Sequence, residues 1–80
     1  RQRGSEYMAR QQPEWFGPRL LEVRLGKTQE SGQPISQEWA ARFFFVSLST
    51  WRNWEHNRQF PDARSLARLR EQWPEVFLRL

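Results

Sequence analysis

Apolar residues recur along the chain at spacings that are typical of short α-helices. Residues 18–25 contain three leucines and one valine, enough for a short helix with a broad apolar face, and Gly26 is suited to end it. The next segment, 27–34, reads KTQESGQP; it is polar and holds a glycine and a proline that break regular structure. The pattern therefore predicts a helix followed by a loop.

Two further helices are predicted on either side of a short turn. Ser36 and Ser47 are suitable N-caps, because a serine oxygen can accept a hydrogen bond from a free backbone N–H of the first turn. A small residue is expected where the two helices cross, and two tryptophans three positions apart should anchor the second helix. The structural core of this unit is expected to be Ala41, Val46, Trp51 and Trp54.

The rest of the chain extends the helical pattern. Asp62 follows Phe60-Pro61 and is a suitable cap for a fourth helix, whose apolar residues Leu66, Leu69 and Trp73 recur at i, i+3 and i+7. Pro74 can open a last short helix, with Val76, Phe77 and Leu80 as its apolar residues. No segment alternates as a strand does, so we expect an all-α fold, a compact bundle of about five short helices.

The outward side of the third predicted helix carries the side chains suited to reading DNA bases. Arginine can pair with guanine, asparagine with adenine, and leucine can touch a thymine methyl group. The alternatives are a solvated helix face for Arg52 and packing within the domain for Leu48. The expected base-contacting residues are Leu48, Ser49, Arg52 and Asn53.

A second group of residues is placed to bind the DNA backbone. Gln37 opens the helix after Ser36, where a side-chain amide and free backbone N–H groups can hold a phosphate. Two more candidates, Asn57 and Arg58, lie in the loop after the third helix. Glu55 is expected to tie this loop to the fold, since phosphate would repel a carboxylate. The expected phosphate contacts are Gln37, Ser47, Asn57 and Arg58.

Composition narrows the classes of function. The net charge is +4, and Lys27 is the only lysine among 13 Lys and Arg residues, which favours an anionic partner although codon bias also explains the arginines. With no cysteine and one histidine, His56, we expect neither disulfide nor metal site nor cofactor, and no spacing indicates an enzyme. No apolar run is long enough to span a membrane, and no signal peptide is apparent.

The segment from Ser36 to Pro61 resembles the lambda-repressor and Cro-like (XRE-type) helix-turn-helix family. It aligns without gaps, and the stretch after it also resembles helix-turn-helix antitoxins. Phe45 stands where the family has a glycine in the turn, and a bulky residue does not readily adopt the positive φ needed there. The matching residues are Ser36, Gln37, Ala41, Val46, Ser47, Thr50, Trp54, Glu55 and Pro61.

The resemblance implies a transcriptional regulator that binds double-stranded DNA, a repressor acting as a homodimer on a palindromic operator. Residues 1–12 are expected to be a flexible basic arm, and 13–80 the helix-turn-helix domain with its motif at 36–61. The dimer contact is expected in the C-terminal apolar segment. A prokaryotic or phage-encoded protein of the cytoplasm, associated with the nucleoid, is the corresponding location.

One feature departs from the family pattern and favours an alternative. Trp39 and Phe43 lie four residues apart, at positions that are normally polar and outward. Either the Trp15-Phe16 pair or the loop at 26–35 covers them, or they form a surface for a partner. The alternative function is therefore binding of a partner protein, as in an antitoxin that neutralises a toxin or a phage-type factor that docks on transcription machinery.

Overall fold

The computed structural model describes residues 13–78, and these form four α-helices followed by a 3₁₀ helix. No strand occurs within this range, so the all-α prediction is confirmed for it; the expected arm at 1–12 and Leu80 lie outside the described residues. The last predicted helix is a 3₁₀ helix of 4 residues. In chain order the elements are α2 (Phe16–Leu25), α3 (Gln37–Phe43), α4 (Leu48–Glu55), α5 (Ala63–Gln72) and η1 (Pro74–Phe77).

Side-chain caps begin three of the helices. The side-chain oxygens of Ser36, Ser47 and Asp62 accept hydrogen bonds from backbone N–H groups of α3, α4 and α5 at 3.0, 3.0 and 2.9 Å. These caps confirm the three predicted helix starts, because each one satisfies a donor that the helix itself leaves unpaired. Helix α2 begins at Phe16, before the predicted start at Pro18, since a proline is tolerated within a first turn.

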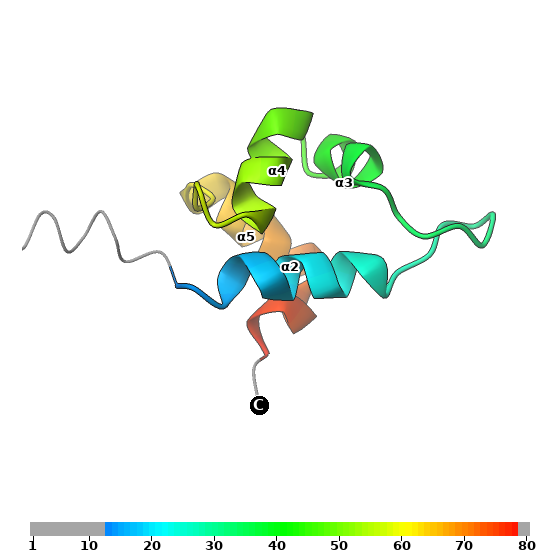
Figure 1. Cartoon of the computed structure of the whole chain (residues 1–80), viewed down its shortest axis with the longest axis horizontal. Helices are drawn as coiled ribbons and strands as arrows, with labels where there is room; N and C mark the ends of the chain where they lie inside the picture. The colour runs from blue at the N-terminus through cyan, green and yellow to red at the C-terminus, as the bar shows by residue number, and fades with distance from the viewer. Residues whose placement is uncertain (1–12, 79–80) are drawn as a thin grey trace, which may run out of the picture.

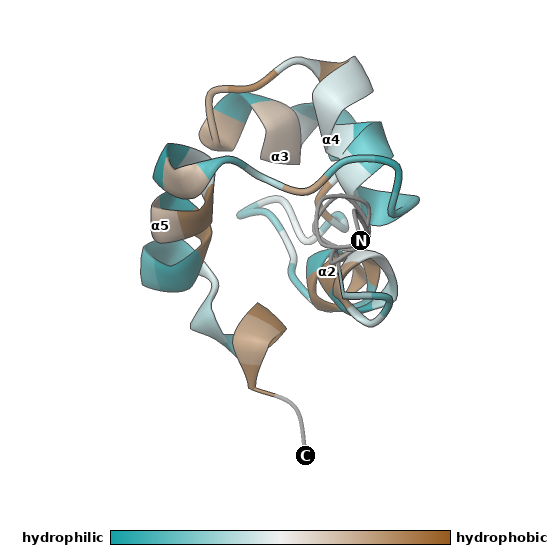
Figure 2. Cartoon of the chain, turned by 90° about the vertical axis from the view of Figure 1, so that its left-hand side faces the viewer, coloured by the Kyte–Doolittle hydropathy of each residue, from teal (hydrophilic) through white to brown (hydrophobic). Residues whose placement is uncertain are grey.

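The helices surround one aromatic-rich core (Figures 1 and 2). Helix α4 packs on both α3 and α2, while η1 packs on α5 and α2. Seen along α2 in Figure 2, the four α-helices enclose the core between them. Leu25, expected on the apolar face of α2, is exposed instead. The buried apolar residues are Phe16, Leu20, Val23, Ile35, Ala40, Ala41, Phe44, Trp51, Trp54, Leu69, Trp73 and Val76, with Val46 packed against them.

Helices α2 and α4 approach closely at Gly17. A Cβ atom at this position would lie 2.5 Å from the carbonyl oxygen of Glu55, so only glycine fits. The Gly17 N–H donates to the side-chain oxygen of Asn57 at 2.9 Å. The start of α2 is thereby held against the end of α4.

The C-terminal segment belongs to the core of the domain. Val76 is fully buried, and the Phe77 ring packs against the rings of Trp15 and Phe16. Arg19 holds this segment in place by donating two hydrogen bonds to the carbonyl oxygen of Glu75, at 3.1 and 2.8 Å. Val76 is therefore not available for the dimer contact expected in this segment, and that expectation is wrong for it. The Phe77 ring packs on aromatic rings of its own domain.

Candidate nucleic-acid interface

The four residues expected to contact bases come from one helix, α4. Ser49 and Arg52 are exposed, and Leu48 and Asn53 are half-buried. The buried side of the same helix is taken by its two tryptophans and its glutamate. This division follows from the helical period, which places residues three and four apart on a common side. The amide nitrogen of Asn53 donates to Gln59 Oε1 at 3.2 Å, which holds that side chain beside the following loop.

Gln37 on α3 and Arg52 on α4 lie side by side. Arg52 Nε donates to Gln37 Oε1 at 3.3 Å, a long hydrogen bond, and Gln37 Nε2 donates to Glu55 Oε1 at 2.8 Å. The structure therefore brings together an expected phosphate-binding residue and an expected base-reading residue from different helices.

Glu55 is the buried centre of this arrangement. Its carboxylate accepts hydrogen bonds from Arg24 Nε at 2.6 Å and Trp51 Nε1 at 2.7 Å, besides that from Gln37. It was expected to tie the following loop to the fold; instead it joins α2, α3 and α4. A buried carboxylate is stable only when paired and hydrogen-bonded, and both conditions are met here.

Arg24 was not recognised as important from the sequence. It is 8% exposed, and besides Glu55 it donates to the carbonyl oxygen of Ile35 at 2.9 Å. The available signal was its spacing: Arg24 comes four residues after Leu20 and so lies on the apolar side of the helix, where a charged residue is buried only with a partner. The sequence gives no means of identifying that partner 31 residues away.

Asn57 and Arg58, the phosphate-binding candidates after α4, differ in their surroundings. Both groups of the Asn57 side-chain amide are used within the fold: Oδ1 accepts from Gly17, and Nδ2 donates to the carbonyl oxygen of Glu14 at 2.9 Å. A phosphate contact by this side chain would require breaking those bonds, and it stays a prediction. Arg58 is exposed, and its backbone N–H donates to the Asn53 carbonyl oxygen at 2.8 Å.

Ser47 is exposed but has a structural role. Its oxygen accepts from the Thr50 backbone N–H, and its hydroxyl donates to Thr50 Oγ1 at 3.0 Å. The residue therefore fixes the start of α4 at the edge of the interface.

The turn between α3 and α4 contains a residue in the left-handed region. Phe45 has a φ of 60°, which a bulky residue adopts only under strain. Its side chain is 76% exposed, and the Arg68 guanidinium lies over the ring at 4.7 Å from the ring centre. The tight turn thus forms without the glycine expected there.

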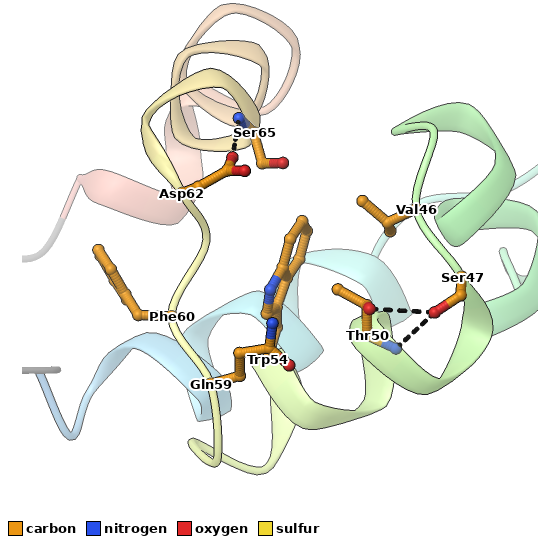
Figure 3. A pocket seen from close by; sticks show the side chains of 8 residues that line it. All are labelled: Val46, Ser47, Thr50, Trp54, Gln59, Phe60, Asp62 and Ser65. Atoms are coloured by element: carbon orange, nitrogen blue, oxygen red, sulfur yellow. Dashed lines mark hydrogen bonds between the residues drawn. The ribbon is translucent and has the colours of Figure 1, made fainter.

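A hollow of about 300 Å³ lies beside the interface, next to the starts of α4 and α5 (Figure 3). Asp62 is its only charged lining residue, and the hydrogen bond from the Ser65 backbone N–H lowers the pKa of that carboxyl. A carboxylate disfavours a phosphate in this hollow. The buried indole N–H of Trp54 has no hydrogen-bond partner in the described chain. The hollow is lined by Val46, Ser47, Thr50, Trp54, Gln59, Phe60, Asp62 and Ser65.

Residues 13–78 contain neither a cluster of potential metal ligands nor a helix that could cross a membrane. No three His, Asp or Glu side chains there gather into a group that could hold a metal ion. None of the helices in this range has the length and apolar character needed to cross a membrane. Comparison of the chain with protein-family models, with curated proteins and with solved structures finds no significant match.

Proposed function

We propose that this domain binds double-stranded DNA in a sequence-specific manner, with α3 and α4 acting as a helix-turn-helix. The observation that carries the proposal is the contact between Gln37 and Arg52 at 3.3 Å. In such a unit the first helix lies across the DNA backbone while the second enters the major groove. A phosphate-binding side chain and a base-reading side chain must then lie next to each other on separate helices, as these two do.

The exposed side chains of α4 supply the chemistry of base reading. Arg52 can donate two hydrogen bonds to guanine, Asn53 can pair with adenine, and Leu48 can pack against a thymine methyl group. The side chain and helix N-terminus at Gln37, together with Arg58, contribute backbone contacts that set the register. The long Gln37–Arg52 hydrogen bond is easily exchanged for contacts to DNA.

The charge distribution supports an anionic partner. The carboxylate of Glu55 is neutralised inside the fold by Arg24, with 2.6 Å between Nε and Oε2. Arg52 is exposed on α4 and Arg58 is exposed in the loop after it, and no exposed acidic residue of α4 offsets their charge, in a chain with a net charge of +4. Such charge raises the rate and affinity of binding to phosphates.

The biological role that fits this chemistry is transcriptional regulation, with repression by occlusion of a promoter. We propose that two copies bind the half-sites of a palindrome whose centres are about 34 Å apart. Binding to one half-site raises the effective concentration of the second copy, which compensates for the weak grip of one small domain. A prokaryotic or phage-encoded protein acting in the cytoplasm suits this role.

Selection of bound sequences from a random double-stranded DNA library tests the proposal. The affinity of the enriched sequence is then measured by fluorescence anisotropy over a range of salt concentrations, for the wild type, Arg52→Ala and Arg58→Ala. Arg52→Ala should lose about 1–3 kcal/mol and relax preference at one base position. Arg58→Ala should weaken all sequences equally and reduce the salt slope by about one.

The two variants are matched, because each removes one exposed arginine. If the library yields no enriched sequence and binding disappears with salt, the domain does not read sequence. If Arg52→Ala keeps the full base preference, α4 is not the recognition helix. Saturation at one copy of the chain per palindrome would overturn the paired half-site arrangement.

A further inference from the structure

Exposed aromatic side chains gather in the segment 39–45. Trp39 is 37% exposed, Phe43 is 39% exposed and Phe45 is 76% exposed. We call these three residues the aromatic patch. The other large exposed apolar residues of the described chain, Leu25 and Leu78, lie on different elements.

The Trp15–Phe16 pair, one of the two segments expected to cover Trp39 and Phe43, packs elsewhere. Trp15 and Phe16 pack against Phe77, and Phe16 also packs against Phe60. The rings of Trp39 and Phe43 stack on each other, with 5.0 Å between their centres and an angle of 20°. Beside them lies a shallow hollow of about 240 Å³, lined by Trp39, Arg42 and Phe43.

Two arginines flank the aromatic patch, and neither has an ion pair within residues 13–78. Arg42 is exposed on α3 and lines the hollow. Arg68 on α5 stacks over Phe45. The rings are thus bordered by two positive charges, of which that of Arg68 also helps to lower the pKa of the Asp62 carboxyl.

Phe45 is unfavourable to the isolated domain in two separate ways. Its φ of 60° strains a residue with a β-carbon, and most of its ring is in water. A glycine at this position would avoid both costs. Strained residues of this kind are characteristic of functional positions, and the ring of Phe45 does little for the core of this fold.

We propose that the aromatic patch, with Arg42 and Arg68, is a docking surface for an acidic segment of another protein that carries large apolar side chains. An apolar side chain fills the hollow beside Trp39, and carboxylates pair with the two arginines. This inference is independent of the proposed DNA binding.

Other occupants fit the observations less well. In a two-fold contact with a second copy, the same arginines would face each other and repel. The rings are also only partly exposed, and each offers less than the roughly 150–250 Å² of a whole aromatic side chain. A stable interface buries about 800 Å² on each partner. Duplex DNA presents its base edges within grooves, which gives stacked rings at the protein surface no apolar face to meet.

The experiment is a titration of the ¹⁵N-labelled full chain with a helical peptide of leucine and glutamate, followed by NMR. The matched control is a peptide of the same length and spacing with lysine in place of glutamate. We expect the glutamate peptide to shift the indole N–H of Trp39 and the backbone amides of Phe43 and Phe45. Exposed ion pairs contribute little each, so the double variant Arg42→Ala/Arg68→Ala should weaken peptide binding by about tenfold.

Arg58→Ala removes one positive charge outside the aromatic patch, so it is the matched control for the single variants Arg42→Ala and Arg68→Ala, and it should leave peptide binding unchanged. Equal binding of both peptides, or of neither, overturns the proposal. So does a shift of the Trp39 signal with protein concentration alone, which would identify a second copy. A loss of duplex DNA binding by Arg42→Ala/Arg68→Ala as large as its loss of peptide binding would assign the surface to nucleic acid and overturn the proposal as well.

Discussion

Replacing Phe45 by glycine and by alanine separates the strain of the turn from the contribution of the ring. Both changes remove the aromatic ring and its contact with Arg68 at 4.7 Å. Only glycine also removes the β-carbon, which makes a φ of 60° unfavourable. We therefore expect the glycine variant to be more stable than the alanine variant, the reverse of the usual order within regular structure.

The size of the difference follows from two opposing terms. The left-handed conformation costs a residue with a β-carbon about 1–2 kcal/mol. Glycine gives back about 0.4–1 kcal/mol because it gains more freedom in the unfolded chain. The net advantage of glycine over alanine is about 1 kcal/mol, or a rise in Tm of roughly 4–8 °C in a domain of this size. Relative to wild type, alanine also loses an exposed cation–π contact of about 0.5–1 kcal/mol.

Urea unfolding followed by circular dichroism measures these differences directly, provided that the slopes of the transitions agree. Phe45→Asn should fall between the two variants, because asparagine tolerates the left-handed region, as Asn57 does at a φ of 59°. An alanine variant as stable as the glycine variant would refute the reasoning, since it would mean that the turn relaxes out of this conformation.

Two further expectations concern charged pairs. Glu55→Gln should lower the unfolding free energy measured in denaturant by about 3–5 kcal/mol, because it leaves Arg24 buried without an opposite charge. The double variant Arg24→Met/Glu55→Leu should lose less stability than Glu55→Gln, and a larger loss would contradict this reasoning. The hydrogen bond from Lys27 holds the pKa of Glu75 below its ordinary value of 4.5, so this pair stabilises the fold fully above that pH and progressively less as pH falls through the lower folded-state value. Glu75→Gln should therefore make the unfolding free energy depend less on pH between about pH 6 and pH 3. If the variant and the wild type lose the same stability over this range, the Lys27–Glu75 pair is not the cause of the pH dependence.

The sequence predicted the helices well where the determining interactions are local. Ser36, Ser47 and Asp62 begin helices because each hydrogen bond reaches only three residues along the chain. The inward tryptophans of α4 follow from the same short-range periodicity. Gly26, which was predicted to end the first helix, is the C-cap of α2.

Features that depend on partners distant in sequence were not predictable. Asn57 looked like a phosphate ligand because it follows α4, yet its side chain bonds to Gly17 and to Glu14, 40 and 43 residues away. The burial of Val76 was likewise not predictable, because no local pattern shows which side of a short helix packs against α2. The base-contacting residues of α4 and their operator remain predictions.

Phe45 and Asn57 are the two non-glycine residues with a positive φ among residues 13–78, and only one of them calls for an explanation outside the fold. At Asn57 the strained backbone comes with a side chain that fixes the start of α2 through two hydrogen bonds, so the fold itself gains from that residue. At Phe45 the same backbone conformation belongs to a residue that is 76% exposed, and the Arg68 guanidinium is the one ring or charge partner of its side chain within residues 13–78. Since glycine would serve the turn better, the ring is best explained by a partner that covers it.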